Sequence, residues 1–182
     1  MALPPLPEDQ WNDEVDAALA RMLPPERRTP AQAGNALSVL VRHPRLTRAF
    51  LGFNTHLLFA STLEPRLREL AVLRVAHRRD CAYEWHHHAE MGRAAGLTDA
   101  EIDAARRVGT APGEFDRLVL DAVDELDEKS ALSDETWTAL GARLDDRQRM
   151  DFVFTVGCYT TLAMAFNTFG VALDETAGRP RH

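Results

Sequence analysis

The chemistry of this chain is concentrated in a short stretch, residues 64–97, which contains four side chains able to exchange protons: Glu69, Cys81, Glu84 and His88. The stretch is predicted to form two helices joined by a short break at 79–80. In the second helix, Cys81, Glu84 and His88 are spaced i, i+3 and i+7, so they share one face. A thiol, a carboxylate and an imidazole on one face can donate and accept protons.

The neighbours of these four residues indicate that they point inward. The face of Cys81, Glu84 and His88 continues through three apolar or small residues: Trp85, Met91 and Ala95. On the preceding helix Glu69 shares its face with Val72, Leu73 and Ala76. Because apolar faces are buried, the sequence predicts ionisable groups held away from water, where charge is costly. We expect a proton-handling site.

Each candidate also has a purely structural interpretation. Asp80 is predicted to cap the second helix, which places Cys81 in its first turn, where the helix dipole lowers a thiol pKa; the alternative is a small packed cysteine. Glu84 and His88 are predicted to form an i,i+4 pair that acts in acid/base catalysis or only in structure. Glu69 is either catalytic or paired with a nearby arginine.

The three consecutive histidines suggest a metal, but the surrounding pattern does not support one. Glu84-x-x-His87 matches half of a di-iron motif, and the chain contains no second Glu-x-x-His. His86 and His87 are expected at the surface. A zinc ion held by the four candidates is the remaining metal alternative. We expect no metal and no cofactor, and neither a Gly-x-Ser-x-Gly elbow nor a glycine-rich nucleotide loop is present.

Composition narrows the class of protein. The chain has 182 residues, enough for one domain spanning 1–182, with loose ends at 1–8 and 174–182. Its net charge of −7 argues against a nucleic-acid partner. A basic stretch is expected to be a solvated helix face: Arg66, Arg68, Arg74, Arg78 and Arg79.

The cysteines and the hydropathy of the chain indicate the cellular compartment in which the protein is expected. Two distant cysteines form no disulfide framework and the start shows no secretory signal, so a cytoplasmic location is expected. The segment 152–173 contains no charged residue and is long enough to span a bilayer. Polar residues interrupt it, so we expect a core helix that also meets another subunit, and no membrane partner.

The remaining pattern predicts an all-α fold, since no alternating strand pattern of useful length is found. Helices are expected at 9–23, 31–42, 45–60, 98–107, 113–128 and 133–144, with a long final helix after Asp145. Three side-chain pairs are predicted to cap helices: Ser61 with Glu64, Thr98 with Glu101, and Asp145 with Gln148.

These residues resemble a known family. Glu69, eleven intervening residues, Cys81-Ala-Tyr83-Glu84-Trp85 and then His88 are similar to the carboxymuconolactone decarboxylase and alkylhydroperoxidase D superfamily. The resemblance implies an alkylhydroperoxidase D-like multihelical bundle that assembles into dimers, trimers or hexamers. In the peroxidase branch it implies relay roles for Glu69 and His88, with Cys81 as the first cysteine of a Cys-x-x-Cys pair. Glu84 replaces the second cysteine, which moves the chain toward the decarboxylase branch.

Three functions are compatible with this pattern. The first is acid/base chemistry, with proton transfer or decarboxylation on a small carboxylated or lactone-type substrate. The second is a thiol-dependent peroxidase, of peroxiredoxin or alkylhydroperoxidase type, that uses Cys81. The third is a non-catalytic oligomer for binding or stress response. Four aromatic residues are predicted to shape the substrate pocket: Tyr83, Trp85, Phe50 and Phe53.

Overall fold

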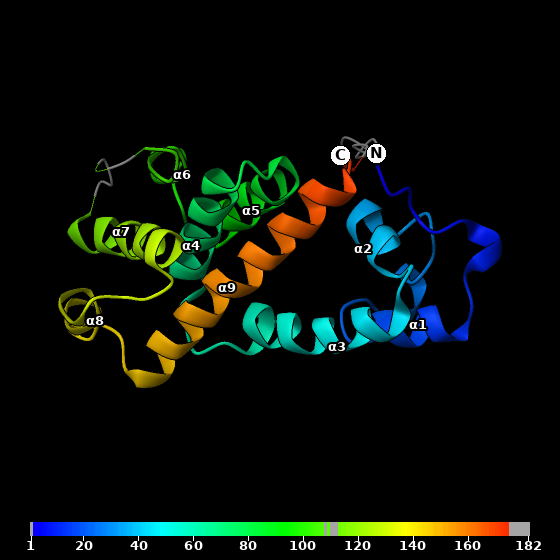
Figure 1. The fold of residues 1–182 in the computed structure, drawn as a ribbon, viewed down its shortest axis with the longest axis horizontal. Helices are drawn as coiled ribbons and strands as arrows, with labels where there is room; N and C mark the ends of the chain where they lie inside the picture. Colours follow the sequence, from blue (N-terminus) through cyan, green and yellow to red (C-terminus); the bar gives the residue numbers. More distant parts are fainter. Residues whose placement is uncertain (1, 108, 110–112, 175–182) are drawn as a thin grey trace. The chain divides into compact units, whose positions relative to one another are not determined.

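The computed structural model describes residues 2–107, 109 and 113–174. Within these residues every regular element is helical, which confirms the all-α prediction (Figure 1). The α-helices are α1 (Asp13–Leu19), α2 (Gly34–Leu40), α3 (Pro44–Thr55), α4 (Pro65–Arg78), α5 (Ala82–Ala94), α6 (Asp99–Ala104), α7 (Glu114–Lys129), α8 (Asp134–Leu140) and α9 (Asp146–Phe169). Short 3-10 turns occupy Glu8–Gln10 and Pro25–Arg27, and a π-turn occupies His56–Ala60.

The chain divides into two compact units, residues 1–55 with 166–182, and residues 56–165. The first unit contains α1, α2 and α3. Its core is a cluster of aliphatic side chains from these helices and the segments between them: Val15, Leu19, Leu23, Ala33, Val41 and Leu51. The described N-terminal residues are held in place where a loose end was expected, because Leu3 and Leu6 donate backbone hydrogen bonds to Phe169 and Ser38. Residues 175–182 of the second expected loose end lie outside the described residues.

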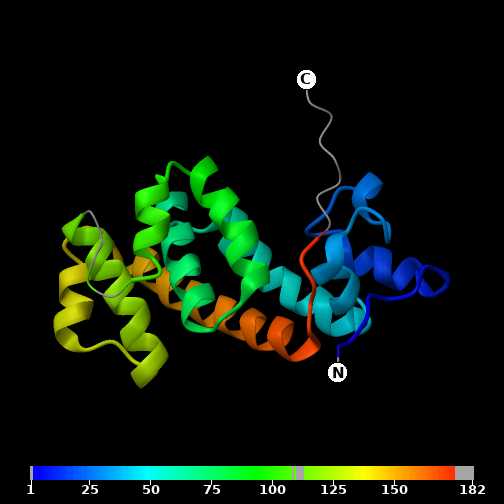
Figure 2. The ribbon, with the colours of Figure 1, turned by 90° about the horizontal axis from the view of Figure 1, so that it is seen from above.

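The second unit contains α4 to α8 and most of α9. Helices α4 and α5 pack against each other as a hairpin, and α4 also packs against α7. Both views of the ribbon show α9 running alongside the α4–α5 hairpin (Figures 1 and 2), and a ring contact between His88 of α5 and Tyr159 of α9 joins them. All four proton-exchanging candidates belong to this unit.

Helices α4 and α7 run parallel and are joined by a ladder of ion pairs. Arg66, Arg74 and Arg78 of α4 bond to carboxylates 50 residues further along the chain: Asp116, Asp124 and Glu128. A constant separation along two helices requires them to run in the same direction. Arg74 is 1 % exposed, and Arg66 and Arg78 are largely covered. The prediction of a solvated basic face was therefore wrong, because the acidic residues of α7 neutralise it.

Helix ends follow the predicted caps in most places. Thr98 and Glu101 form a reciprocal capping box. Asp145 and Gln148 form another, in which the backbone N–H of each residue donates to the side-chain oxygen of the other. The Ser61–Glu64 prediction was wrong: the Ser61 hydroxyl contacts Asp151, 3.1 Å away, and α4 begins at Pro65. Proline at the first helical position lacks the N–H that such a cap would satisfy.

Helix α9 is long and apolar enough to cross a membrane by length and composition alone, and 44 % of its most apolar window is buried within the protein. The core helix of a soluble protein meets the same criterion. A single helix of this kind is weak evidence for a membrane protein.

Candidate functional site

A hydrogen bond between α4 and α5 forms the centre of the site. His88 Nδ1 lies 2.6 Å from Glu69 Oε2, and the two side chains are buried, with residue exposures of 7 % and 0 %. The predicted partner of His88 was Glu84, one turn earlier on the same helix. That prediction was wrong, because the neighbouring helix brings the Glu69 carboxylate to the imidazole instead.

The Glu69 carboxylate is held in its ionised form. Burial alone would raise its pKa, but the bond and charge of His88, together with Arg68, lower the pKa below its ordinary value. Arg68 Nε donates to Glu69 Oε1 over 3.0 Å. An ionised carboxylate only accepts hydrogen bonds, so His88 Nδ1 carries the hydrogen of this bond, and the opposite nitrogen, Nε2, is the proton acceptor when the imidazole is neutral.

Glu84 has the opposite character. It is 2 % exposed, and neither carboxyl oxygen makes a geometrically acceptable hydrogen bond to any of the described residues. Burial raises its pKa to about 8, and the only opposing influence is the nearby Cys81 thiol. At neutral pH Glu84 is therefore mostly protonated, while Glu69, on the adjacent helix, is ionised.

Cys81 does not occupy the position predicted for it. Asp80 adopts a left-handed conformation, with φ of 48°, and Cys81 itself is the N-cap of α5. The thiol is buried, and burial together with the Glu84 carboxylate raises the pKa of Cys81 to about 12. The predicted lowering of this pKa was wrong, because loss of water and a neighbouring acid outweigh the backbone N–H groups of the helix start.

Tyr159 of α9 joins the site and was missed by the sequence analysis. Its ring meets the His88 ring edge to face, with centroids 4.8 Å apart. Burial, and after it the charge of Glu69, raise the pKa of Tyr159 above its ordinary value. A tyrosine within a long uncharged helix, one turn after Thr155, was the available signal, but without the packing it could not be linked to a site 71 residues earlier.

The predicted pocket aromatics are distributed over both units. Tyr83 stacks on His87, with centroids 4.4 Å apart, and the Arg106 guanidinium lies 3.9 Å from the Trp85 ring centroid. Both residues are half-buried on α5. In the first unit, Phe50 packs against the aliphatic core cluster and Phe53 is partly exposed. Their roles in substrate binding stay predictions.

His86 and His87 are both half-buried, with T-shaped rings 5.3 Å apart, where surface positions were expected. Among the described residues, no three His, Cys, Asp or Glu side chains are placed to hold a metal ion. The cluster of Glu69, Cys81, Glu84 and His88 therefore lacks the donor arrangement that the zinc alternative requires.

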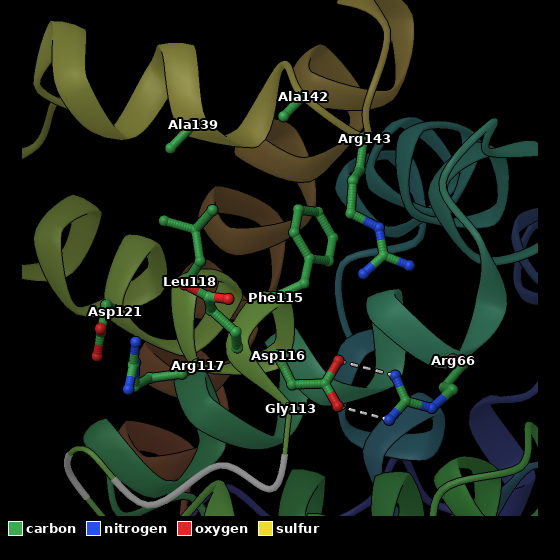
Figure 3. Close-up of a pocket in the computed structure, with 11 residues that line it drawn as sticks. Arg66, Gly113, Phe115, Asp116, Arg117, Leu118, Asp121, Ala139, Ala142 and Arg143 are labelled. Carbon is green, nitrogen blue, oxygen red and sulfur yellow. Dashed lines mark hydrogen bonds and ion pairs between the residues drawn. The ribbon is translucent and has the colours of Figure 1, made fainter.

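A cavity of about 770 Å³ lies elsewhere in the second unit, between α7 and α8 (Figure 3). Phe115 and Leu118 form part of its wall, and the Arg143 guanidinium lies 4.4 Å from the Phe115 ring centroid. Arg66, at its edge, is paired with Asp116. None of the four proton-exchanging candidates lines this cavity.

Three solved structures share the fold. A peroxidase-related protein with an alkylhydroperoxidase AhpD core from Ralstonia eutropha is 18% identical, with TM-score 0.74, covering 96% of this chain and 94% of that one. A peroxidase-related protein from a Silicibacter species is 15% identical, with TM-score 0.72 and coverages of 97% and 91%. A protein of unknown function from Agrobacterium tumefaciens, provisionally described as the antioxidant defence protein AhpD, is 22% identical, with TM-score 0.65 and coverages of 74% and 94%.

These identities establish the alkylhydroperoxidase D-like fold and nothing further. A comparison with curated proteins found no match. The model of the carboxymuconolactone decarboxylase family matches residues 44–128, a range that includes Glu69, Cys81, Glu84 and His88 but not Tyr159. Residues 44–128, a little less than half of the chain, are therefore similar to the carboxymuconolactone decarboxylase family.

Proposed function

We propose that the protein is an enzyme that transfers protons on a small carboxylated or lactone-type substrate, in the manner of a decarboxylase. The observation that carries this proposal is the contrast between two buried carboxyl groups. The pKa of Glu69 is lowered and the pKa of Glu84 is raised to about 8, so one group is ionised and the other protonated near neutral pH. Acid/base catalysis requires such a pair.

In this proposal each group has a defined role. His88 Nε2 takes a proton from the carbon beside the substrate carbonyl, and the electron pair of the broken C–H bond moves onto the carbonyl oxygen. Glu69 stabilises the imidazolium that results. Glu84 then donates its proton to a carbon of the enolate, whose electron pair forms the new C–H bond. The proton on His88 passes to the Glu84 carboxylate, which restores both groups. In a decarboxylation the C–C bond supplies the electron pair, carbon dioxide leaves, and Glu84 protonates the carbon.

The thiol-peroxidase alternative is less well supported. A peroxidase needs a thiolate, and a pKa raised to about 12 keeps Cys81 protonated at neutral pH. Glu84 also occupies the position of the second cysteine of a Cys-x-x-Cys pair. The acid/base proposal uses the same carboxyl group directly.

A panel of small lactones and keto acids incubated in D₂O tests the proposal by NMR. We expect deuterium to enter the carbon beside the carbonyl, or carbon dioxide to be released, with at least one compound. Glu69→Gln and Glu84→Gln should each reduce the rate by about 10²- to 10⁴-fold. Glu90→Gln is the matched control, because Glu90 is an exposed carboxylate on α5.

Absence of exchange and of carbon dioxide release across the panel, with dithiothreitol-dependent hydroperoxide consumption that Cys81→Ser abolishes, would replace this proposal with the peroxidase.

A further inference from the structure

Helix α9 adds an aromatic hydroxyl to the proton-transfer site. Tyr159 is 2 % exposed, and its ring lies edge to face against His88, the residue that receives the proton in the proposed function. This contact comes from a helix outside the family match at 44–128. The site is therefore built from three helices of the second unit, α4, α5 and α9.

The hydroxyl of Tyr159 makes no hydrogen bond to any residue that the structure describes. Tyrosine hydroxyls inside proteins usually find a hydrogen-bond partner. Thr155, one turn earlier on the same face of α9, is fully buried and its hydroxyl is also unpaired within the described chain. The carboxyl oxygens of Glu84, on α5, are likewise buried without a hydrogen-bond partner among the described residues. Buried polar groups without a protein partner can bind a ligand.

We propose that Tyr159 is a further catalytic residue, whose hydroxyl donates a hydrogen bond to the substrate oxygen that becomes negative during proton transfer. This inference rests on the proposed function and extends it. The raised pKa of Tyr159 supports the role, because the hydroxyl stays protonated and can donate. Hydrogen-bond donors aimed at a developing oxyanion are among the largest contributions to catalysis.

The same geometry indicates the class of substrate. Among the residues that the structure describes, Arg68 is the cation bonded to these groups, and its guanidinium is paired with the Glu69 carboxylate. The substrate oxygen that accepts the hydrogen bond from Tyr159 is therefore an uncharged carbonyl oxygen, as in a lactone or a ketone. It becomes the negative oxygen of an enolate in the reaction. A substrate carboxylate, where present, lies away from this hydrogen bond.

Tyr159→Phe tests the inference and removes only the hydroxyl, so the ring contact with His88 is kept. Thr161→Val is the matched control, because it removes an exposed hydroxyl from the same helix, α9. Chemical denaturation establishes that both variants fold. The readout is the rate of deuterium entry, as a function of concentration, into the lactone or ketone that the wild-type protein exchanges fastest.

We expect Tyr159→Phe to lower kcat by about 10²- to 10³-fold with little change in KM, because the bond strengthens as the oxygen gains charge. Thr161→Val should stay within about twofold of the wild-type protein. A Tyr159→Phe rate equal to the wild-type rate, or a change confined to KM, overturns the inference while leaving the proposed function intact. Absence of exchange by the wild-type protein overturns both.

Discussion

A buried carboxyl group with no hydrogen-bond partner among the described residues, Glu84, is the most unusual single residue of the site. It remains buried because it is neutral near pH 7: a protonated carboxyl avoids most of the cost of moving a charge out of water. Its neutrality also makes it a proton donor. The same property links the stability of the protein to pH.

Glu84→Gln should remove a pH dependence of stability. Because the folded-state pKa of Glu84 is raised from 4.5 to about 8, the folded state binds more protons than the unfolded state between these values. Stability therefore falls as pH rises through this window, by about 1.4 kcal/mol per pH unit at most. Urea unfolding at pH 6 and pH 8 should show this fall in the wild-type protein and a smaller one in the variant. Equal falls would mean that Glu84 ionises normally.

Cys81 should be unreactive in the folded protein. Its thiol is buried and its pKa is raised to about 12, so little thiolate is present at neutral pH. In a Cys158→Ser background, alkylation by iodoacetamide at pH 7.5 should be at least tenfold slower than in the urea-unfolded protein. Rapid alkylation with a midpoint below pH 8 would contradict the geometry and favour the peroxidase.

At the residue scale, the sequence predicted which groups are buried but not how they pair. Helical spacing correctly placed Glu69, Cys81, Glu84 and His88 on buried faces. Helical spacing could not decide whether His88 pairs with Glu84, one turn away, or with Glu69 on the neighbouring helix, because the pairing depends on how α4 and α5 pack. The position of Tyr159 depends on packing over a still longer sequence separation.

At the scale of elements, the parallel pair α4 and α7 is held together by charge as well as by apolar contact. Arg74 is buried, donates to both carboxylate oxygens of Asp124 at 2.7 and 2.5 Å, and donates to the Ala105 carbonyl. A buried arginine that loses its carboxylate leaves an uncompensated charge, which costs far more than an exposed pair contributes.

Asp124→Asn should therefore destabilise the fold by about 3–5 kcal/mol, measured by urea unfolding. Glu128→Gln is the control from the same ladder, because the Glu128 side chain is largely exposed and its pair with Arg78 should contribute about 1 kcal/mol or less. Similar effects of the two substitutions would show that burial does not distinguish them.

Local signals predicted the helices well, since hydrophobic periodicity and caps act over a few residues. The predicted caps at Thr98 and Asp145 were confirmed. The ion-pair ladder could not be foreseen, because a basic stripe such as that of Arg66, Arg74 and Arg78 has the same pattern whether water or another helix faces it. Its acidic partners lie 50 residues away.

At the scale of the whole molecule, α9 carries an exposed apolar stripe at a helical spacing: Met150, Phe154 and Met164, each more than half exposed. We expect this stripe to pack against a second copy of the chain, since exposed apolar stripes of this kind mark interaction sites. Light scattering coupled to size-exclusion chromatography should give more than one subunit for the wild-type protein and a smaller assembly for Phe154→Glu. Leu46→Glu, on α3, is the control. A wild-type monomer would contradict the expectation.

The central claim is that two buried carboxyl groups of one site hold opposite protonation states near neutral pH. Carboxyl ¹³C NMR of glutamate-labelled protein, titrated from pH 3 to pH 9, measures this directly. We predict one carboxyl resonance whose titration midpoint lies at about pH 8 and which is absent from Glu84→Gln. A second resonance should titrate below the ordinary glutamate pKa of 4.5 and be absent from Glu69→Gln. Titration of both groups near 4.5 would contradict the account.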